Sequence, residues 1–372
     1  MDSYSDLANR REVYIQRYAS HLRNEYLTTG LAAIYKATRE VILDAESIDS
    51  IAQRTALNKA IKEAIEPISN EMWLNTTGEL QDLAAQESGY YAKMFGTVNA
   101  VTMSVPAAEK VINYANKAKL NLDSKSGVWT YFVNKNKSSI IKQIQAQVNA
   151  GYRNNETVFQ MAKRVKRVSE GLLNHQAESL VRTGASHFSA MAREAMMQDN
   201  RDIVDRKVFS AFFDNRTTLT CRGFSGNIYD LDDKSAPVLP LHFNERSIYQ
   251  YLVKGQDSID GTKAAVGGKK GEAAEESFER REKALNKKRD DPDYDGTVKS
   301  KVTRTSNKDR AFKAEQIDAD DKMDTWLRSN PQWFIESSLG KKRAELFMQG
   351  KVKLKGFTDL IGRPLRLDEL DY

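Results

Sequence analysis

Residues 137–150 read KSSIIKQIQAQVNA, and this stretch decides how the centre of the chain is interpreted. An α-helix turns once in about 3.6 residues, so apolar side chains three or four positions apart share one face. The stretch has this spacing at Ile140, Ile141, Ile144 and Val148. It therefore predicts an amphipathic helix with a polar opposite face.

The same pattern continues on both sides of this stretch. Downstream, the sequence 151–155 breaks the helix, and two further helices are predicted over 156–168 and 172–198. Upstream, we predict a helix over 6–28, helices over 31–45 and 51–65, with the last one closed by Pro67, and a helix over 68–95. Ser104 and Pro106 predict one more helix start, with Ser104 as the N-cap.

The period changes after residue 205. Residues 207–213, KVFSAFF, are rich in aromatic side chains and predict a strand that leads into a turn at Asp214. Apolar residues become rare after Tyr251 and return near Asp320. We therefore expect a mainly α protein with a small α+β module near 205–250, a charged linker and a small C-terminal α/β unit. The predicted boundaries are 1–134, 135–252, 253–319 and 320–372.

Composition excludes several classes of protein. The 372 residues hold one cysteine, Cys221, which excludes an intramolecular disulfide and a zinc site built from several thiolates. No run approaches the ~20 apolar residues that span a bilayer. The first residues, MDSYSD, lack a basic segment followed by an apolar one, so we expect no signal peptide and no membrane association.

Positive charge is unevenly distributed. Residues 263–313 carry 15 Lys and Arg against 10 Asp and Glu, and the rest of the chain taken together is close to neutral. Such a segment suits a polyanion. The candidates for contact with DNA are Lys269, Lys270, Lys287, Lys288 and Arg289. The alternative is a solvated tether without a ligand.

Potential metal ligands gather between residues 214 and 247. Asp, Cys, His and Glu all bind divalent cations, so a metal-dependent nuclease is one interpretation, with Asp214 holding the cation and His242 as the general base. The alternative is structural: Asp214 caps a turn, and Arg216 pairs with a carboxylate such as Asp232 or Glu245. We favour the structural interpretation.

The sequence lacks several motifs that identify common classes of enzyme. The sequence has no phosphate-binding loop with Lys-Ser/Thr, no His-Glu-x-x-His and no Gly-x-Ser-x-Gly. We therefore expect a protein that works by binding large partners, without catalysis, cofactor or metal.

The order of the motifs resembles the phage Mu F-like head morphogenesis family of minor head proteins. Members have an apolar-faced helix, a break at a glycine, a second helix, and a helix with an Ala/Val-Arg-Thr motif, here similar to Val181-Arg182-Thr183. A strand, Asp-x-Arg-Thr, a Cys, a Gly and Pro-x-His follow. The matching residues are Asp214, Arg216, Thr217, Cys221, Gly226, Pro240, His242 and Arg246. The chain departs at Gly184, where the family usually has Glu, and at Glu245 and Ser247, where it has cysteines.

The resemblance covers roughly residues 135–250 and 320–372. It implies a minor component of a tailed-phage head, assembled in the host cytoplasm and located in the virion near the portal. The implied partners are the portal protein, the major capsid or scaffolding protein, and packaged double-stranded DNA bound without sequence preference. The implied function is head morphogenesis or DNA ejection.

Overall fold

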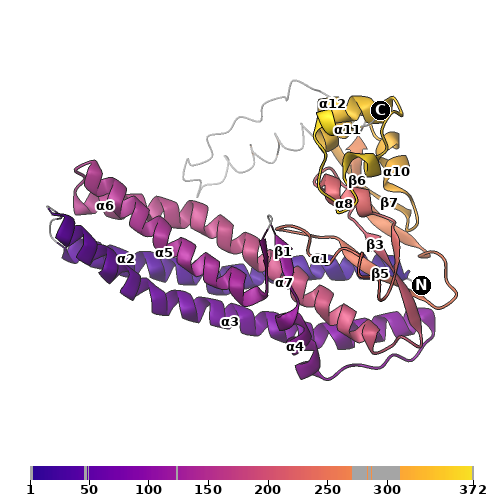
Figure 1. The fold of residues 1–372 in the computed structure, drawn as a ribbon, viewed down its shortest axis with the longest axis horizontal. Helices are drawn as coiled ribbons and strands as arrows, with labels where there is room; N and C mark the ends of the chain where they lie inside the picture. Colours follow the sequence, from indigo (N-terminus) through magenta and orange to yellow (C-terminus); the bar gives the residue numbers. More distant parts are fainter. Residues whose placement is uncertain are drawn as a thin grey trace. The chain divides into compact units, whose positions relative to one another are not determined.

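The computed structural model describes residues 3–45, 48, 50–122, 125–269, 283, 286 and 311–370. Figure 1 shows that helices dominate, with a few short strands among them. The expected fold class, mainly α with small α+β parts, is confirmed. None of the helices described combines the length and apolar character that crossing a membrane requires.

The chain forms two compact units. Unit 1 comprises residues 1–9, 206–230 and 249–372, and unit 2 comprises residues 10–205 and 231–248. The boundary falls within one helix and two strands, so it does not coincide with the boundaries expected from the sequence. The expected boundary at 134/135 lies inside a helix.

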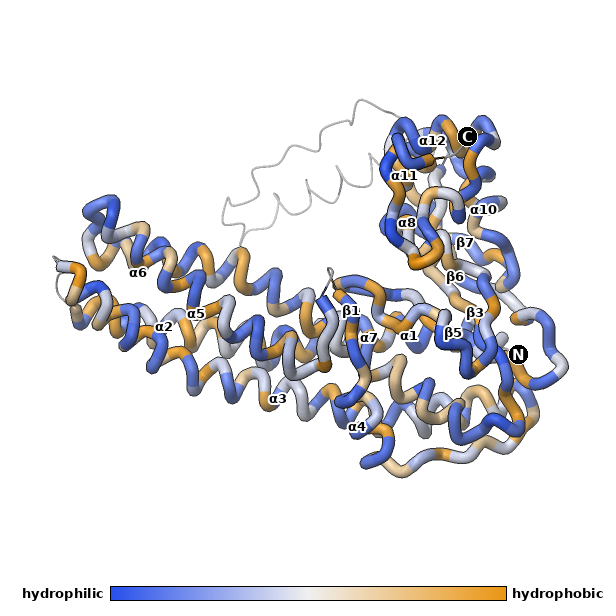
Figure 2. The backbone as a smooth tube through the Cα atoms, in the orientation of Figure 1, coloured by the Kyte–Doolittle hydropathy of each residue, from blue (hydrophilic) through white to orange (hydrophobic). Residues whose placement is uncertain are grey.

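Unit 2 is a bundle in which the long helices run side by side (Figure 1). Its elements, with α1 beginning in unit 1 and β3 continuing into it, are α1 (Tyr4–Leu22), the π-helix η1 (Arg23–Thr28), α2 (Thr29–Asp44), α3 (Ile51–Asn99), α4 (Ala108–Lys117), β1 (Leu120–Leu122), β2 (Lys125–Gly127), α5 (Trp129–Arg153), α6 (Val158–Val168), the π-helix η2 (Ser169–Leu173), α7 (Asn174–Gln198) and β3 (Val204–Ser210). Hydrophilic and hydrophobic residues alternate along these helices, as Figure 2 shows, because each buries one face.

Three aromatic rings occupy the middle of the bundle core. Trp129 of α5 lies edge-on to Trp73 of α3 and to Phe188 of α7, with ring centroids 6.1 and 5.8 Å away. The indole nitrogen of Trp129 donates to Thr77 Oγ1 at 3.0 Å, so this buried donor is paired. This packing joins three helices that are distant in sequence.

Unit 1 combines short strands and short helices. Its further elements are α8 (Leu219–Phe224), β4 (Ile228–Asp230), β5 (Ile248–Val253), β6 (Thr262–Lys269), β7 (Ala311–Asp318), α10 (Met323–Ser329), α11 (Gln332–Leu339), α12 (Lys341–Met348), and the 3-10 helices η3 (Leu354–Phe357) and η4 (Leu367–Glu369). The strands form one sheet in the order β4-β3-β5 and one antiparallel pair, β6 with β7. Trp326 packs against Phe213 and Phe334 in the core of this unit.

Some local predictions were wrong. Pro67 does not end a helix but lies inside the 49-residue helix α3. The buried face of α3 runs from Ile65 before the proline to Ser69 and Met72 after it. Ser104 is not an N-cap: the cap position is Ala107, while the backbone of Ser104 is hydrogen-bonded on both sides by the side chain of Asn200. Part of the expected linker forms strands β6 and β7, and β3 spans most of the predicted strand.

Candidate functional site

Asp214 closes a turn in unit 1. Its Oδ1 accepts hydrogen bonds from the backbone nitrogens of Arg216 and Thr217, at 3.0 and 2.9 Å, and from Thr217 Oγ1 at 2.9 Å. An aspartate that accepts from the backbone two and three residues ahead stabilises such a turn. This is the capping arrangement that the structural interpretation describes for Asp214.

A buried arginine supports the same turn. Arg222 Nη2 donates to the carbonyl of Asp214 at 2.7 Å, and its Nε donates to the carbonyl of Thr217 at 2.8 Å. Burial lowers the pKa of Arg222 to about 10, and the charge of Asp214 opposes that change, so the side chain stays cationic at neutral pH. Sequence reasoning misses Arg222, because a single arginine in a short helix carries no spacing signal.

The carboxylates expected to pair with Arg216, those of Asp232 and Glu245, belong to the other unit. Arg216 lies exposed, whereas Asp232 pairs with Arg201, and Glu245 pairs with His242 at 3.1 Å. Each of these carboxylates therefore has a basic side chain close to it within unit 2. The sequence places several basic residues within reach of these acids, and only the fold selects among them.

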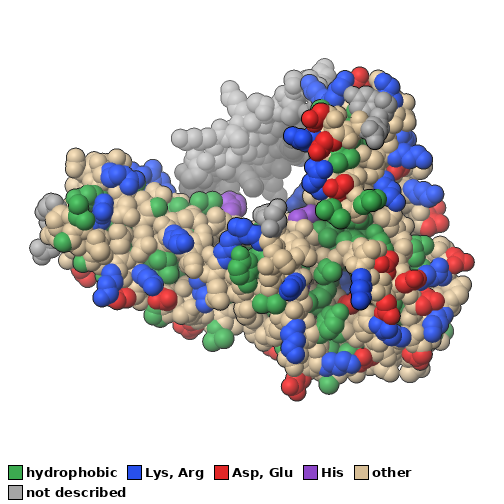
Figure 3. Space-filling model, in the orientation of Figure 1, with side chains coloured by type: hydrophobic (Ala, Val, Ile, Leu, Met, Phe, Trp, Pro, Cys, Tyr) green, Lys and Arg blue, Asp and Glu red, His purple; other side chains and the backbone are tan. Residues whose placement is uncertain are grey.

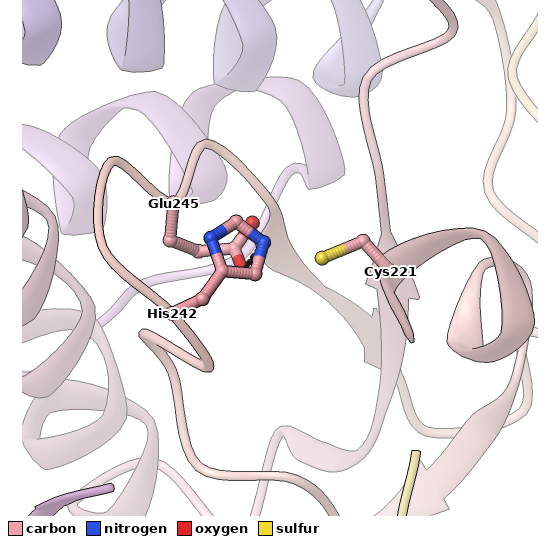
Figure 4. A group of neighbouring side chains, drawn as sticks. All are labelled: Cys221, His242 and Glu245. Carbon is pink, nitrogen blue, oxygen red and sulfur yellow. Dashed lines mark ion pairs between the residues drawn. The ribbon is translucent and has the colours of Figure 1, made fainter. Parts of the chain in front are cut away.

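Glu245 organises the loop of unit 2 that contains His242. Its Oε1 accepts from the backbone nitrogens of Arg246 and Ser247, at 3.0 and 2.8 Å, and its Oε2 faces His242 Nε2. Figure 4 shows the imidazole of His242 next to this carboxylate. The other ring nitrogen lies 2.9 Å from the carbonyl of Phe243. Both ring nitrogens thus lie within hydrogen-bond distance of an oxygen atom.

The loop is attached to the helix that carries the Val-Arg-Thr motif. Asn244 donates from its backbone nitrogen to Thr183 Oγ1 at 3.1 Å and from its side chain to Ser179 Oγ at 2.9 Å. Ser186 Oγ donates to the carbonyl of Glu245 at 2.8 Å. Three hydroxyl groups on α7 therefore hold the backbone of residues 244–245 and the side chain of Asn244.

The remaining motif residues have local roles. Cys221, also drawn in Figure 4, belongs to unit 1, where it is buried in α8 behind the N-cap Thr218. Gly226 adopts a φ of +85°, a left-handed conformation that favours glycine, and it donates to the carbonyl of Phe209. In unit 2, Pro240 is buried and Arg246 is partly buried. Asp214 and His242 belong to different units.

No known family, curated protein or solved structure matches the chain. The likeness to the phage head morphogenesis family therefore rests on the motifs in the sequence.

The candidate DNA contacts are only partly visible. Lys269 ends strand β6, whereas Lys270, Lys287, Lys288 and Arg289 lie outside the described residues. The first lysine of the basic segment is not available to a phosphate. Lys263 is buried, it donates to the carbonyls of Ala319 and Asp321, and burial lowers its pKa to about 8.

A pocket of about 400 Å³ lies between α5 and α7 in unit 2. Its lining combines apolar rings with amides and hydroxyls, namely Phe132, Lys135, Asn136, Ser139, His175, Gln176, Ser179, Leu180 and Phe243. Two of the lining residues accept hydrogen bonds from Gln143, at Ser139 Oγ and Gln176 Oε1. Sequence reasoning misses this pocket, since scattered polar residues on a helix resemble an ordinary solvent-facing surface.

A buried charge cluster joins α1, α3 and α7. Arg193 binds Glu87 at 2.7 Å and lies 3.7 Å from Glu12, and Arg11 binds the other oxygen of Glu87. Burial raises the pKa of Glu12 to about 7, against the lowering effect of Arg193. No sequence pattern links these residues, because the partners come from separate helices.

The expectation that the basic surplus lies in residues 263–313 alone was wrong. Residues 129–168, which form α5 and α6, hold eight Lys and Arg and one acidic residue, Glu156. Their surplus of seven exceeds the net charge of +6 of the whole chain. The signal was present in the sequence, but summing the charge over all other residues concealed it.

Proposed function

We propose that the protein is a minor head protein of a tailed bacteriophage, which associates with the portal and with packaged DNA. On this proposal it acts in head morphogenesis or DNA ejection, and the major capsid or scaffolding protein is a further partner. The proposal starts from the order of motifs shared with the phage Mu F-like family.

One observation carries the proposal beyond the motifs. The Val-Arg-Thr helix and the Pro-x-His loop lie about 60 positions apart in the sequence. They are joined in unit 2 through Thr183, Ser179 and Ser186. The two motifs were recognised separately in the sequence, and hydrogen bonds hold them together in unit 2. This contact supports the proposal that both belong to one family pattern. The replacement of family cysteines by Glu245 and Ser247 fits the same unit, since the Glu245 carboxylate closes the loop by hydrogen bonds.

The test is co-purification with the portal protein encoded beside this chain. The purified proteins are mixed at low and at high salt and captured through a tag on the portal. We expect binding that persists at high salt, because salt screens exposed charges but affects the closely packed core of a specific protein interface much less. An absence of binding at both salt concentrations contradicts the proposal.

The rival function is a metal-dependent nuclease centred on Asp214 and His242. It requires cleavage of DNA that magnesium or manganese stimulates and that His242→Ala abolishes while the fold is retained. The hydrogen bonds of Asp214 Oδ1 to its own turn do not favour it, since these donors compete with a cation. We expect no cleavage by the wild-type protein. If the protein cleaves DNA and His242→Ala abolishes that cleavage, the nuclease function is favoured over the assembly function.

A further inference from the structure

The positive charge of α5 is arranged in one row. Lys135, Lys142 and Arg153 are exposed, and they are separated by seven and eleven residues. At about 100° per residue, these separations return to within about 20° of the same direction, so the three cations lie on one line along the helix. With a rise of about 1.5 Å per residue, the row is about 27 Å long.

Acidic residues do not neutralise this region from within. Glu156, the one acid of residues 129–168, lies between α5 and α6 and is bound by Arg164, whose hydrogen bond lowers the pKa of the carboxyl group. Across the part of the chain that the structure describes, Lys142, Arg153 and Lys163 have no ion-pair partner. Figure 3 shows Lys and Arg side chains over α6. The field of these cations therefore extends into solvent, where an anionic partner would meet it.

The row has the dimensions of a nucleic-acid backbone contact. A length of about 27 Å corresponds to about eight base pairs, and the first step of about 10 Å is similar to the width of about 12 Å of the major groove. Polar side chains such as Ser138 and Asn149 lie near the row on the same helix.

We infer that the basic surface of α5 and α6, defined by Lys135, Lys142, Arg153 and Lys163, binds the phosphate backbone of double-stranded DNA without reading its sequence. This inference rests on the proposed function, in which packaged DNA is a partner, and it assigns that contact to the helical bundle rather than to the charged segment alone. Such contacts release counterions, so the affinity falls steeply with salt.

The test compares two triple variants of the full chain. One carries Lys142→Gln, Arg153→Gln and Lys163→Gln. The matched control carries Lys59→Gln, Lys62→Gln and Lys93→Gln, which remove three exposed lysines from α3. Binding to a labelled duplex of about 30 base pairs is followed by fluorescence anisotropy between roughly 50 and 200 mM salt. Circular dichroism establishes that both variants keep the helical fold.

We expect the α5–α6 variant to lose at least about tenfold in affinity, and its slope of log affinity against log salt to become shallower by about 2.7, while the control stays close to wild type. Equal affinities for the two variants would overturn the assigned surface and leave the proposed function standing. A wild-type chain that binds the duplex at neither salt would overturn the inference, and portal capture then decides separately whether the proposed function survives. Binding to vesicles of anionic lipid, without binding to the duplex, would also overturn it and identify a membrane surface.

Discussion

Gly184 occupies a position on α7 that leaves no room for a side chain. A Cβ placed there would lie 2.6 Å from a ring carbon of Trp129 and 2.8 Å from a methyl carbon of Leu80. The family that this chain resembles usually has Glu at this position, and the buried indole explains why a larger side chain is excluded here. The packing of the core of unit 2 therefore requires glycine at this position.

We predict that Gly184→Ala lowers the free energy of unfolding by about 1–3 kcal/mol, because Trp129 must move out of its packed position. The control is Gly89→Ala in α3, where a Cβ meets nothing within 4 Å. There alanine should raise stability by about 0.5–1 kcal/mol through the lower entropy of the unfolded chain. Urea unfolding followed by circular dichroism measures both, and a neutral Gly184→Ala would contradict the packing described for Trp129.

Glu12 makes stability depend on pH. The folded state holds a proton on this carboxyl up to about pH 7, whereas the unfolded chain releases it near the ordinary value of 4.5. A carboxyl whose pKa is raised by folding stabilises the protein most below the unfolded pKa, and that contribution is lost as the pH rises to about 7. Ionised Glu12 then remains buried, with the side-chain amide of Gln16 at 3.0 Å and Arg193 at 3.7 Å.

We predict that Glu12→Gln stabilises the protein at pH 8 relative to pH 5, by about 3 kcal/mol at most, because glutamine keeps the shape without the buried charge. Denaturation at the two pH values measures the difference from wild type, so the opposite effect of the buried His187, which is unchanged by the substitution, cancels. Glu63→Gln, at an exposed pair with Lys59, should change little at either pH. A loss of stability at pH 8 would mean that the pair with Arg193 is stabilising.

Individual side chains show where sequence reasoning succeeds at this scale. Asp214 is followed by residues whose backbone nitrogens it can reach, so its turn is a local property that the sequence reveals. Arg216 had several acids within plausible reach, and the choice depends on tertiary structure. The cluster of Glu12, Glu87 and Arg193 is inaccessible to any local pattern, since three helices contribute to it.

At the scale of elements, α3 shows how tertiary packing overrides a local signal. Proline removes one backbone hydrogen bond and normally ends or bends a helix. In α3 the buried positions Leu57, Ile61, Ile65 and Met72 keep their helical spacing through Pro67, which itself points to solvent. The burial of this face outweighs the local cost, and periodicity would have been the better guide than the proline.

We predict that Pro67→Ala raises the free energy of unfolding by about 1–2 kcal/mol. The substitution restores a backbone donor to the middle of α3 and removes no buried contact. The gain is smaller than the ~3 kcal/mol penalty of an interior proline, because proline also restricts the unfolded chain. Thermal and urea unfolding measure the change. A destabilised variant would show that the helix depends on a bend at this position.

The whole molecule is best understood through the distribution of its charge. The net charge of +6 is smaller than the surplus of seven on residues 129–168, so the remainder of the chain is slightly acidic. The second basic region, residues 263–313, begins with Lys263, which is buried and committed to two carbonyl groups. Charge counted along the sequence locates both regions, but only the structure shows which cations face solvent.

The pairing of β6 with β7 allows the charged segment to be removed cleanly. Lys269 and Ala311 are direct partners at the end of this antiparallel pair, so residues 270–310 connect two neighbouring positions. An Asn-Gly dipeptide forms the two-residue turn that such a pair accepts. A variant with Asn-Gly in place of residues 270–310 should therefore keep the fold of unit 1.

We predict that this shortened variant binds the portal as wild type does and keeps most of its affinity for duplex DNA. The physical reason is that the cations of α5 and α6 are unchanged by the replacement, and each retained phosphate contact keeps its share of counterion release. Portal capture and fluorescence anisotropy at matched salt measure the two activities side by side. Loss of portal binding would place the docking surface in residues 270–310, and loss of most DNA affinity would assign the DNA contact to that segment instead of the helical bundle.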